Sequence, residues 1–318
     1  MQRIEGLVPA PNWTSAAGAL EGILAHAGIV LPRHAVMGLT GHAWHFCLGA
    51  EGGVVALPSG PAQFDRAAMV ERYARTGLRF ERFAAAAEGG RDAAVNWARE
   101  RLDAGVPLIG WDFHLHEFGI VTGYDTDRGG FFVEDLLTEQ VGAFVPWDAW
   151  PLLGWIELWA PIEPVEVEVP GVLVAALETA AALLDGREGD AEPGLLGWRG
   201  LEAWAEAFDG ATEVDRAGNA YTLAVLQAAR ADGAAFLRDA ASALPDARQA
   251  IEAAARALEE EVKALAPLIT LFPFPTGGHG NVAVPGLRGS AAMVLRRAAR
   301  HERECLAALD DALRLLNG

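Results

Sequence analysis

The segment from Gly105 to Asp135 constrains the fold of this chain more than any other part of the sequence. It reads GVPLIGWDFHLHEFGIVTGYDTDRGGFFVED, in which short apolar runs alternate with polar residues. The runs at 106–111, 118–124 and 131–133 have the length and the β-branched and aromatic content of strands. The segment therefore predicts three short strands joined by two tight turns.

Length and composition indicate a folded protein of two domains. The chain has 318 residues, of which 52% are hydrophobic, so it is long for one domain and can bury a sizeable core. Its formal net charge of −18 argues against nucleic acid and membrane surfaces as partners, because an acidic surface repels phosphate groups and anionic lipid. We expect a small-molecule partner, and a homodimer is compatible with the composition.

The sequence lacks signals for export, membrane insertion and cysteine chemistry. The N-terminal MQRIEGLVPAPNW has no charged start followed by a long apolar region, and no charge-free apolar stretch of 18 residues occurs. Cys47 and Cys305 are too few for a disulfide framework or a four-thiolate zinc site. We therefore expect a cytoplasmic protein, and the sequence predicts no cofactor.

The character of the chain changes near residue 165. Before this point, strand-like runs rich in Val, Phe and Trp accompany two amphipathic helices, which we expect at 15–27 and 91–103. After it, alanine-rich stretches with helical spacing predict five helices, at 171–185, 197–209, 218–244, 247–271 and 288–317. The pattern predicts an α+β domain at 1–165 followed by an all-α helical bundle domain at 170–318.

Several segments of the first part resemble papain-like cysteine peptidases and acyltransferases. PNWTSAAGALEGILAHAG, at 11–28, is similar to the helix that carries the nucleophile in the bacteriocin-processing peptidases. VMGLTGHAWHF, at 36–46, resembles the glycine-rich segment that follows this helix in the N-terminal domain of the butirosin-biosynthesis acyltransferase. The strands around Gly110 and Glu117 are similar to later strands of that family. The resemblance covers roughly 7–160 and implies a papain-like fold in a bacterial protein.

At the positions where these enzymes keep cysteine and histidine, the chain has other residues. Ser15 matches the nucleophile position, at a helix N-terminus where the macrodipole favours an anion, and a one-residue shift would place Thr14 there. Glu117 matches the histidine, and Asp135 matches the third catalytic residue. His116 could serve as the base only through a β-bulge, because neighbouring residues on a strand point to opposite faces.

This mismatch leaves two interpretations of the site. A serine hydroxyl needs a base with a pKa of about 7 beside it, and carboxylates without an imidazole are weak bases. We therefore favour a scaffold that binds a small amide, amino-acid-derived or acyl molecule without papain-type catalysis. The alternative is an acyltransferase or amidohydrolase that uses Ser15 or Thr14 as the nucleophile.

Aromatic and histidine residues suggest a ligand pocket near the same segments. We expect a cleft between the start of helix 15–27, the 38–47 loop and the 111–118 turn. Its expected ligand-binding residues are Trp13, His42, Trp44, His45, Trp111, Asp112 and His114. A second alternative is metal binding by His42-x-x-His45 and His114-x-His116 with Asp112, because His-x-His on a strand places both rings on one face.

Overall fold

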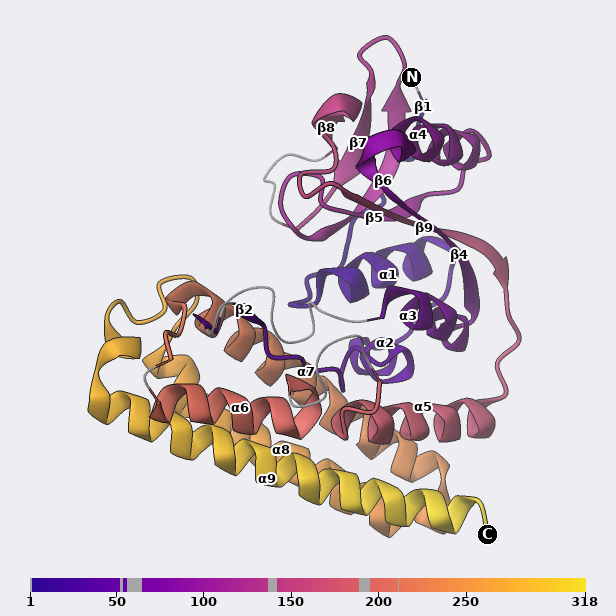
Figure 1. Ribbon diagram of the computed structural model, residues 1–318. Helices are drawn as coiled ribbons and strands as arrows, with labels where there is room; N and C mark the ends of the chain where they lie inside the picture. The colour runs from indigo at the N-terminus through magenta and orange to yellow at the C-terminus, as the bar shows by residue number, and fades with distance from the viewer. Residues whose placement is uncertain (1, 52–53, 56–64, 137–141, 189–194, 211) are drawn as a thin grey trace. The chain divides into compact units, whose positions relative to one another are not determined.

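The structure is a computed structural model that describes residues 2–51, 54–55, 65–136, 142–188, 195–210 and 212–318 (Figure 1). The chain forms two compact units, which we call the sheet unit (Met1–Pro32 and Val70–Val167) and the helical unit (Arg33–Met69 and Glu168–Gly318). An antiparallel sheet in the first half and a mostly helical second half confirm the α+β class. The second boundary between the units falls at Val167 and Glu168, and residues 33–69 group with the helices of the second half.

One antiparallel sheet forms the centre of the sheet unit. Its strand order is β4-β9-β5-β6-β7-β8, and β1 pairs with β6. The strands are β1 (Gln2–Arg3), β4 (Leu78–Ala86), β5 (Leu108–Trp111), β6 (Phe118–Asp125), β7 (Gly130–Glu134), β8 (Ala143–Pro146) and β9 (Trp155–Pro164). The three predicted strands are β5, β6 and β7, which are neighbours in the sheet. The long β4 was not predicted, because its alanine-rich second half resembles a helix in sequence.

Two helices cover opposite faces of this sheet (Figure 1). Helix α4 (Ala87–Asp103) contributes Ala98 to a buried core that also contains Val121 of β6. Helix α1 (Ser15–His26) lies on the other face, where its Gly22 approaches Ile120, the residue next to Val121. Because adjacent residues of a strand point to opposite faces, β6 is covered on both sides, and residues 118–124 are all buried.

Helix α1 is held against the segment that precedes it. A Cβ atom at Gly18 would lie 2.4 Å from the carbonyl oxygen of Ala10, so this close approach needs a glycine. The amide of Ala10 also donates a hydrogen bond to the carbonyl oxygen of Gly18 at 2.9 Å. The chain before α1 is therefore fixed along the helix, which sets the position of Ser15 at the first helical residue.

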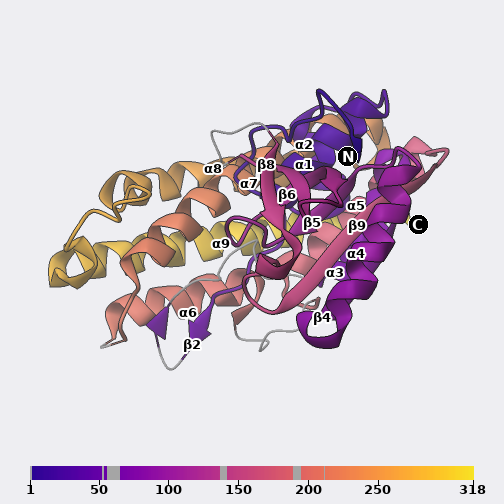
Figure 2. The same ribbon diagram turned by 90° about the horizontal axis from the view of Figure 1, so that it is seen from above.

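Long helices make up the helical unit. They are α2 (Arg33–Thr40), α5 (Val169–Leu184), α6 (Gly197–Asp209), α7 (Arg216–Ala243), α8 (Arg248–Leu271) and α9 (Pro285–Leu316), with a small hairpin of β2 (Ala50–Glu51) and β3 (Val54–Val55). The short α3 (Arg66–Arg72) spans the boundary between the units. Helix α9 packs along both α6 and α8 (Figure 2). The five predicted helices match α5 to α9 within three residues at each end. No helix in the described part of the chain is long and apolar enough to cross a membrane.

The segment after α2 explains why residues 33–69 belong with the helices. The fully buried Trp44 packs against Phe236 of α7 with ring centroids 5.9 Å apart. Its indole nitrogen donates to the carbonyl oxygen of Gly38 at 3.0 Å. A Cβ at Gly38 would lie 2.2 Å from the ring of Phe236, so α2 and α7 touch at a position where only glycine fits. These contacts make Trp44 a core residue of the helical unit.

We expect Gly38→Ala to destabilise the protein by about 1–3 kcal/mol, because the added methyl group would overlap the Phe236 ring. Gly289→Ala in α9 is the matched control, since a Cβ there meets no atom within 4 Å. The control should stabilise the helix by about 0.5–1 kcal/mol. Urea unfolding measures both changes, and an equal, small effect in the two variants would contradict the tight packing of α2 on α7.

Candidate functional site

The start of α1 lies against the turn between β5 and β6. The Ser15 hydroxyl donates a hydrogen bond to Oε2 of Glu117 at 2.5 Å. Oγ of Ser15 in turn accepts a hydrogen bond from the amide of Phe118, the first residue of β6, at 3.1 Å. Two residues that the resemblance placed in one constellation are thus in direct contact. The hydroxyl is engaged both as a donor and as an acceptor.

Thr14 is the other candidate nucleophile, and its environment differs. It is the N-cap residue of α1, but its side chain makes no capping hydrogen bond. Its amide donates to Oδ1 of Asn12 at 2.9 Å, a local turn that shapes the start of the helix. Its hydroxyl is buried and has no hydrogen-bond partner among the described residues. Of the two candidates, Ser15 is the one in contact with a carboxylate.

Asp135, just after β7, binds the imidazole of His114. Nδ1 of His114 lies 2.8 Å from Oδ2 of Asp135, whose side chain is only 10% exposed. Sequence reasoning assigned His114 to ligand binding and Asp135 to orienting a base. The structure brings them together as a histidine–aspartate pair. The bond between them uses Nδ1 of His114 and does not involve Nε2.

His116 points to a different partner. Its Nδ1 lies 2.6 Å from Oδ1 of Asp112, and 57% of its side chain is exposed. Asp112 is fully buried, has a positive φ of 71°, and also accepts a hydrogen bond from the amide of Leu153 at 2.5 Å. Because β6 begins at Phe118, His116 lies in the turn, and the bulge considered for it does not form within the described strands. Its role as a base remains a prediction without a supporting contact.

A small open pocket lies beside these pairs. It is lined by Phe113, His114, Leu115, Glu117, Gly119, Val133 and Asp135. Glu117, His114 and Asp135 supply polar atoms, and the remaining side chains form an apolar wall. The arrangement brings three predicted site residues to one cavity. Such a mixed lining can bind a small molecule that has both polar and hydrocarbon parts.

Sequence reasoning missed the apolar half of this lining. Phe113 and Leu115 alternate with the two histidines in the turn, and Val133 belongs to β7. Gly119 stands two positions after Glu117, on the same side of the chain, and this period-two spacing could have indicated it.

The other predicted ligand-binding residues are not among those that line the pocket. Trp13 precedes the site and is 45% exposed, and the carbonyl oxygen of Trp111 accepts a hydrogen bond from the Trp150 indole at 3.0 Å. His42, Trp44 and His45 belong to the helical unit and are buried there. Ligand binding by these residues stays a prediction.

The structure gives the metal alternative no support. The expectation that His114 and His116 share a strand face is wrong, because both lie in the turn and each contacts its own aspartate. In the ranges that the structure describes, no group of three His, Cys, Asp or Glu side chains is arranged to hold a metal ion.

The solved structures that match this chain include a distant neighbour. It is a double glycine motif protease from an AMS/PCAT transporter, solved in complex with the leader peptide, at 12% identity and a TM-score of 0.29. The match covers 51% of this chain and 99% of the protease. No family model matches the chain, and no curated protein sequence matches it.

We expect Ser15→Ala to destabilise the protein by about 1–3 kcal/mol, because it removes a donor from the partly buried Glu117 and an acceptor from the Phe118 amide. Ser290→Ala is the control: the exposed Ser290 hydroxyl only bonds back to the carbonyl oxygen of Gly286 at 3.0 Å, so a change within about 0.5 kcal/mol is expected. Urea unfolding compares the two. Equal stability of Ser15→Ala and wild type would show that this contact does not hold α1 to β6.

Proposed function

We propose that this protein binds a small molecule in the pocket beside Ser15, on a papain-like scaffold that does not use papain-type catalysis. The supporting observation is the engagement of the Ser15 hydroxyl by Glu117 and by the Phe118 amide. An attacking hydroxyl needs a base matched to neutral pH and a lone pair free to reach the substrate. In this geometry a carboxylate takes the hydrogen bond and an amide occupies a lone pair, which favours a structural role for Ser15.

The pocket lining indicates the class of ligand. Glu117 and Asp135 offer carboxylate oxygens as acceptors, so N–H groups of an amide or amine can be held there. Phe113, Leu115 and Val133 offer an apolar wall for a short hydrocarbon part. This combination suits a small amide or amino-acid-derived molecule, which is the ligand class that we propose.

The binding proposal is tested with N-acetyl amino-acid amides and small primary amines as probes in native mass spectrometry and calorimetry. Leu115→Trp should lower the affinity at least about tenfold, because a larger side chain would fill the pocket that Leu115 lines. Leu152→Trp is the matched control: both leucines are 49% exposed, and Leu152 is not among the lining residues. Absence of saturable binding in wild type, or equal affinity in the two variants, would contradict the proposal.

Acyl transfer or amide hydrolysis is a second candidate, favoured by the 2.5 Å contact between Ser15 and Glu117. In this alternative Ser15 attacks an acyl carbon, its proton passes to Glu117 and then to the leaving group, and amides at the start of α1 stabilise the oxyanion. Asp135 would orient His114 beside the acyl group.

This alternative predicts a covalent acyl group on the 11–28 peptide after incubation with activated aryl esters or thioesters. Ser15→Ala should lose both the adduct and the turnover, whereas Ser290→Ala should keep them. Peptide mass mapping and ester turnover provide the measurements. Turnover that survives in Ser15→Ala would exclude this serine as the nucleophile.

A further inference from the structure

Three ionisable side chains meet inside the helical unit and form what we call the buried cluster: Arg230 of α7, Glu261 of α8 and Glu302 of α9. None of the three has exposed side-chain surface. Arg230 donates from Nε to Oε1 of Glu302 at 2.7 Å, and its Nη2 bonds to the same oxygen. Its Nη1 donates to the carbonyl oxygen of Ala43 at 2.7 Å. The cluster thus connects three helices with the segment that follows α2.

The charges of the buried cluster do not balance. Glu261 lies 3.8 Å from Arg230, so two carboxyl groups share a single guanidinium. With both carboxyls ionised the cluster has one excess negative charge, and an uncompensated buried charge is strongly destabilising. Among the described residues, Cys305 of α9 is the further titratable group that acts on the cluster. Burial raises the pKa of its thiol well above the ordinary value, so this thiol stays neutral and adds no charge to the cluster.

Hydrogen bonding in the buried cluster points to the same imbalance. Both oxygens of Glu261 and Oε2 of Glu302 are buried without a hydrogen-bond donor in the described part of the chain. Buried acceptors in folded proteins are nearly always paired, and leaving them unpaired is costly. One proton on Glu261 would turn that carboxyl into a donor toward Glu302, while Glu302 stays ionised against Arg230. Burial, followed by the charge of Glu302, raises the pKa of Glu261 well above its usual range.

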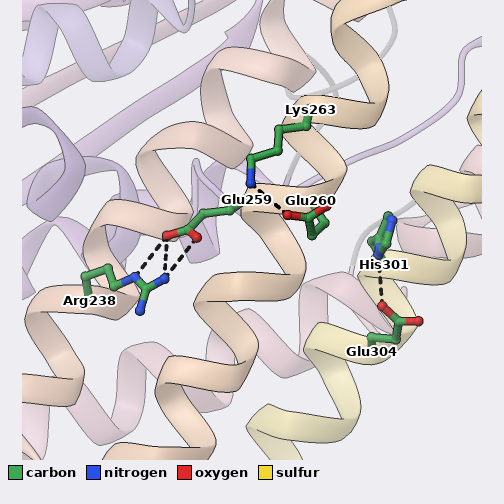
Figure 3. A network of polar contacts seen from close by, with 6 residues as sticks. All are labelled: Arg238, Glu259, Glu260, Lys263, His301 and Glu304. Carbon is green, nitrogen blue, oxygen red and sulfur yellow. Dashed lines mark hydrogen bonds and ion pairs between the residues drawn. The ribbon is translucent and has the colours of Figure 1, made fainter.

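We propose that Glu261 keeps a proton at neutral pH, and that this proton, shared with Glu302 beside Arg230, holds α7, α8, α9 and the Ala43 segment together. The helical unit is therefore a pH-sensitive element. Loss of the proton leaves two carboxylates competing for one guanidinium, which weakens the junction that also carries the Arg230 bond to Ala43. Neighbouring ion pairs on the same helices, Arg238–Glu259, Lys263–Glu260 and His301–Glu304, are partnered separately (Figure 3).

The direction of the pH dependence follows from the raised pKa of Glu261. In the unfolded chain this carboxyl ionises near its ordinary pKa of about 4.5, whereas in the folded protein it keeps the proton to higher pH. Between these two values the folded state binds more protons, so rising pH favours unfolding. The stabilisation is complete below the unfolded pKa and is lost as pH rises through the folded pKa. One proton changes the unfolding equilibrium constant by up to about tenfold per pH unit.

Glu261→Gln tests the proposal, because glutamine has the shape of the protonated carboxyl and cannot ionise. Urea unfolding of the full chain is compared between wild type and Glu261→Gln from about pH 5 to about pH 9. The unfolding constant of wild type should rise relative to that of Glu261→Gln, by up to about tenfold per pH unit, until Glu261 has ionised. Parallel pH profiles for wild type and Glu261→Gln would overturn the proposal.

Glu260→Gln is the matched control on the same helix. Glu260 is exposed and accepts a hydrogen bond from Lys263 at 2.7 Å, and this bond lowers its pKa (Figure 3). Because its stabilising effect is lost only at acidic pH, the profile of Glu260→Gln should run parallel to that of wild type over the range tested.

A measurement on the wild-type protein keeps the test decisive if Glu261→Gln does not fold. Carbon-13 labelling of the glutamate side-chain carboxyls allows their ionisation to be read by NMR at pH 7. A carboxyl carbon with the chemical shift of a protonated acid supports the proposal, and a spectrum in which every glutamate is ionised overturns it.

Discussion

The antiparallel pairing of β5 with β6 is the constraint on which the candidate site depends. Its last pair is Trp111 with Phe118, so the six residues between them must close as a turn. Asp112 begins that turn with a positive φ and binds both His116 and the Leu153 amide, which fixes the loop from inside. Glu117 ends it and is placed against Ser15. The pairing of β6 with β7 then brings Asp135 to the same end of the sheet.

Buried carboxylates in the two units differ in the hydrogen-bond donors that surround them. Glu157, in the sheet unit, has no exposed side chain and is surrounded by donors: Arg82 binds both of its oxygens, at 2.5 and 2.9 Å, and the Trp159 indole donates at 2.6 Å. Hydrogen bonds from these donors and one cation replace the water that Glu157 loses on burial. In the buried cluster a single arginine faces two carboxyls, so a proton has to replace the missing cation. The two sites therefore differ in the number of donors that each carboxylate receives.

Much of the fold could be predicted, because the spacing of apolar residues along the sequence indicates which side of a helix or strand is buried. The runs that became β5 to β7 and the apolar spacing of α5 to α9 belong to elements whose partners are themselves regular. The alanine-rich end of β4 and the placement of α2 could not be predicted this way. β4 is a strand because it pairs along the length of β9, and α2 joins the helical unit because Gly38 fits against Phe236. Both depend on contacts distant in sequence, which local propensity does not contain.

Of the contacts in the candidate site, one could be predicted from the sequence and another could not. Ser15 and Glu117 were placed together by the resemblance, and the structure has them in contact. The pairing of His114 with Asp135 could not be predicted from the sequence, because it depends on the backbone conformation inside the turn at 112–117, which apolar spacing does not determine. This turn begins at Asp112, whose backbone φ is positive.

The membership of residues 33–69 in the helical unit also has a consequence for synthesis. Arg230 and Ala43, which bond to each other, are 187 residues apart in sequence. During translation the apolar surface of α2 and Trp44 leaves the ribosome long before α7 exists to cover it, while the strands of the sheet unit are made in between. The apolar face of α2 therefore stays uncovered until α7 has been synthesised. This makes the early segment, rather than the completed bundle, the part of the nascent chain most in need of protection from aggregation.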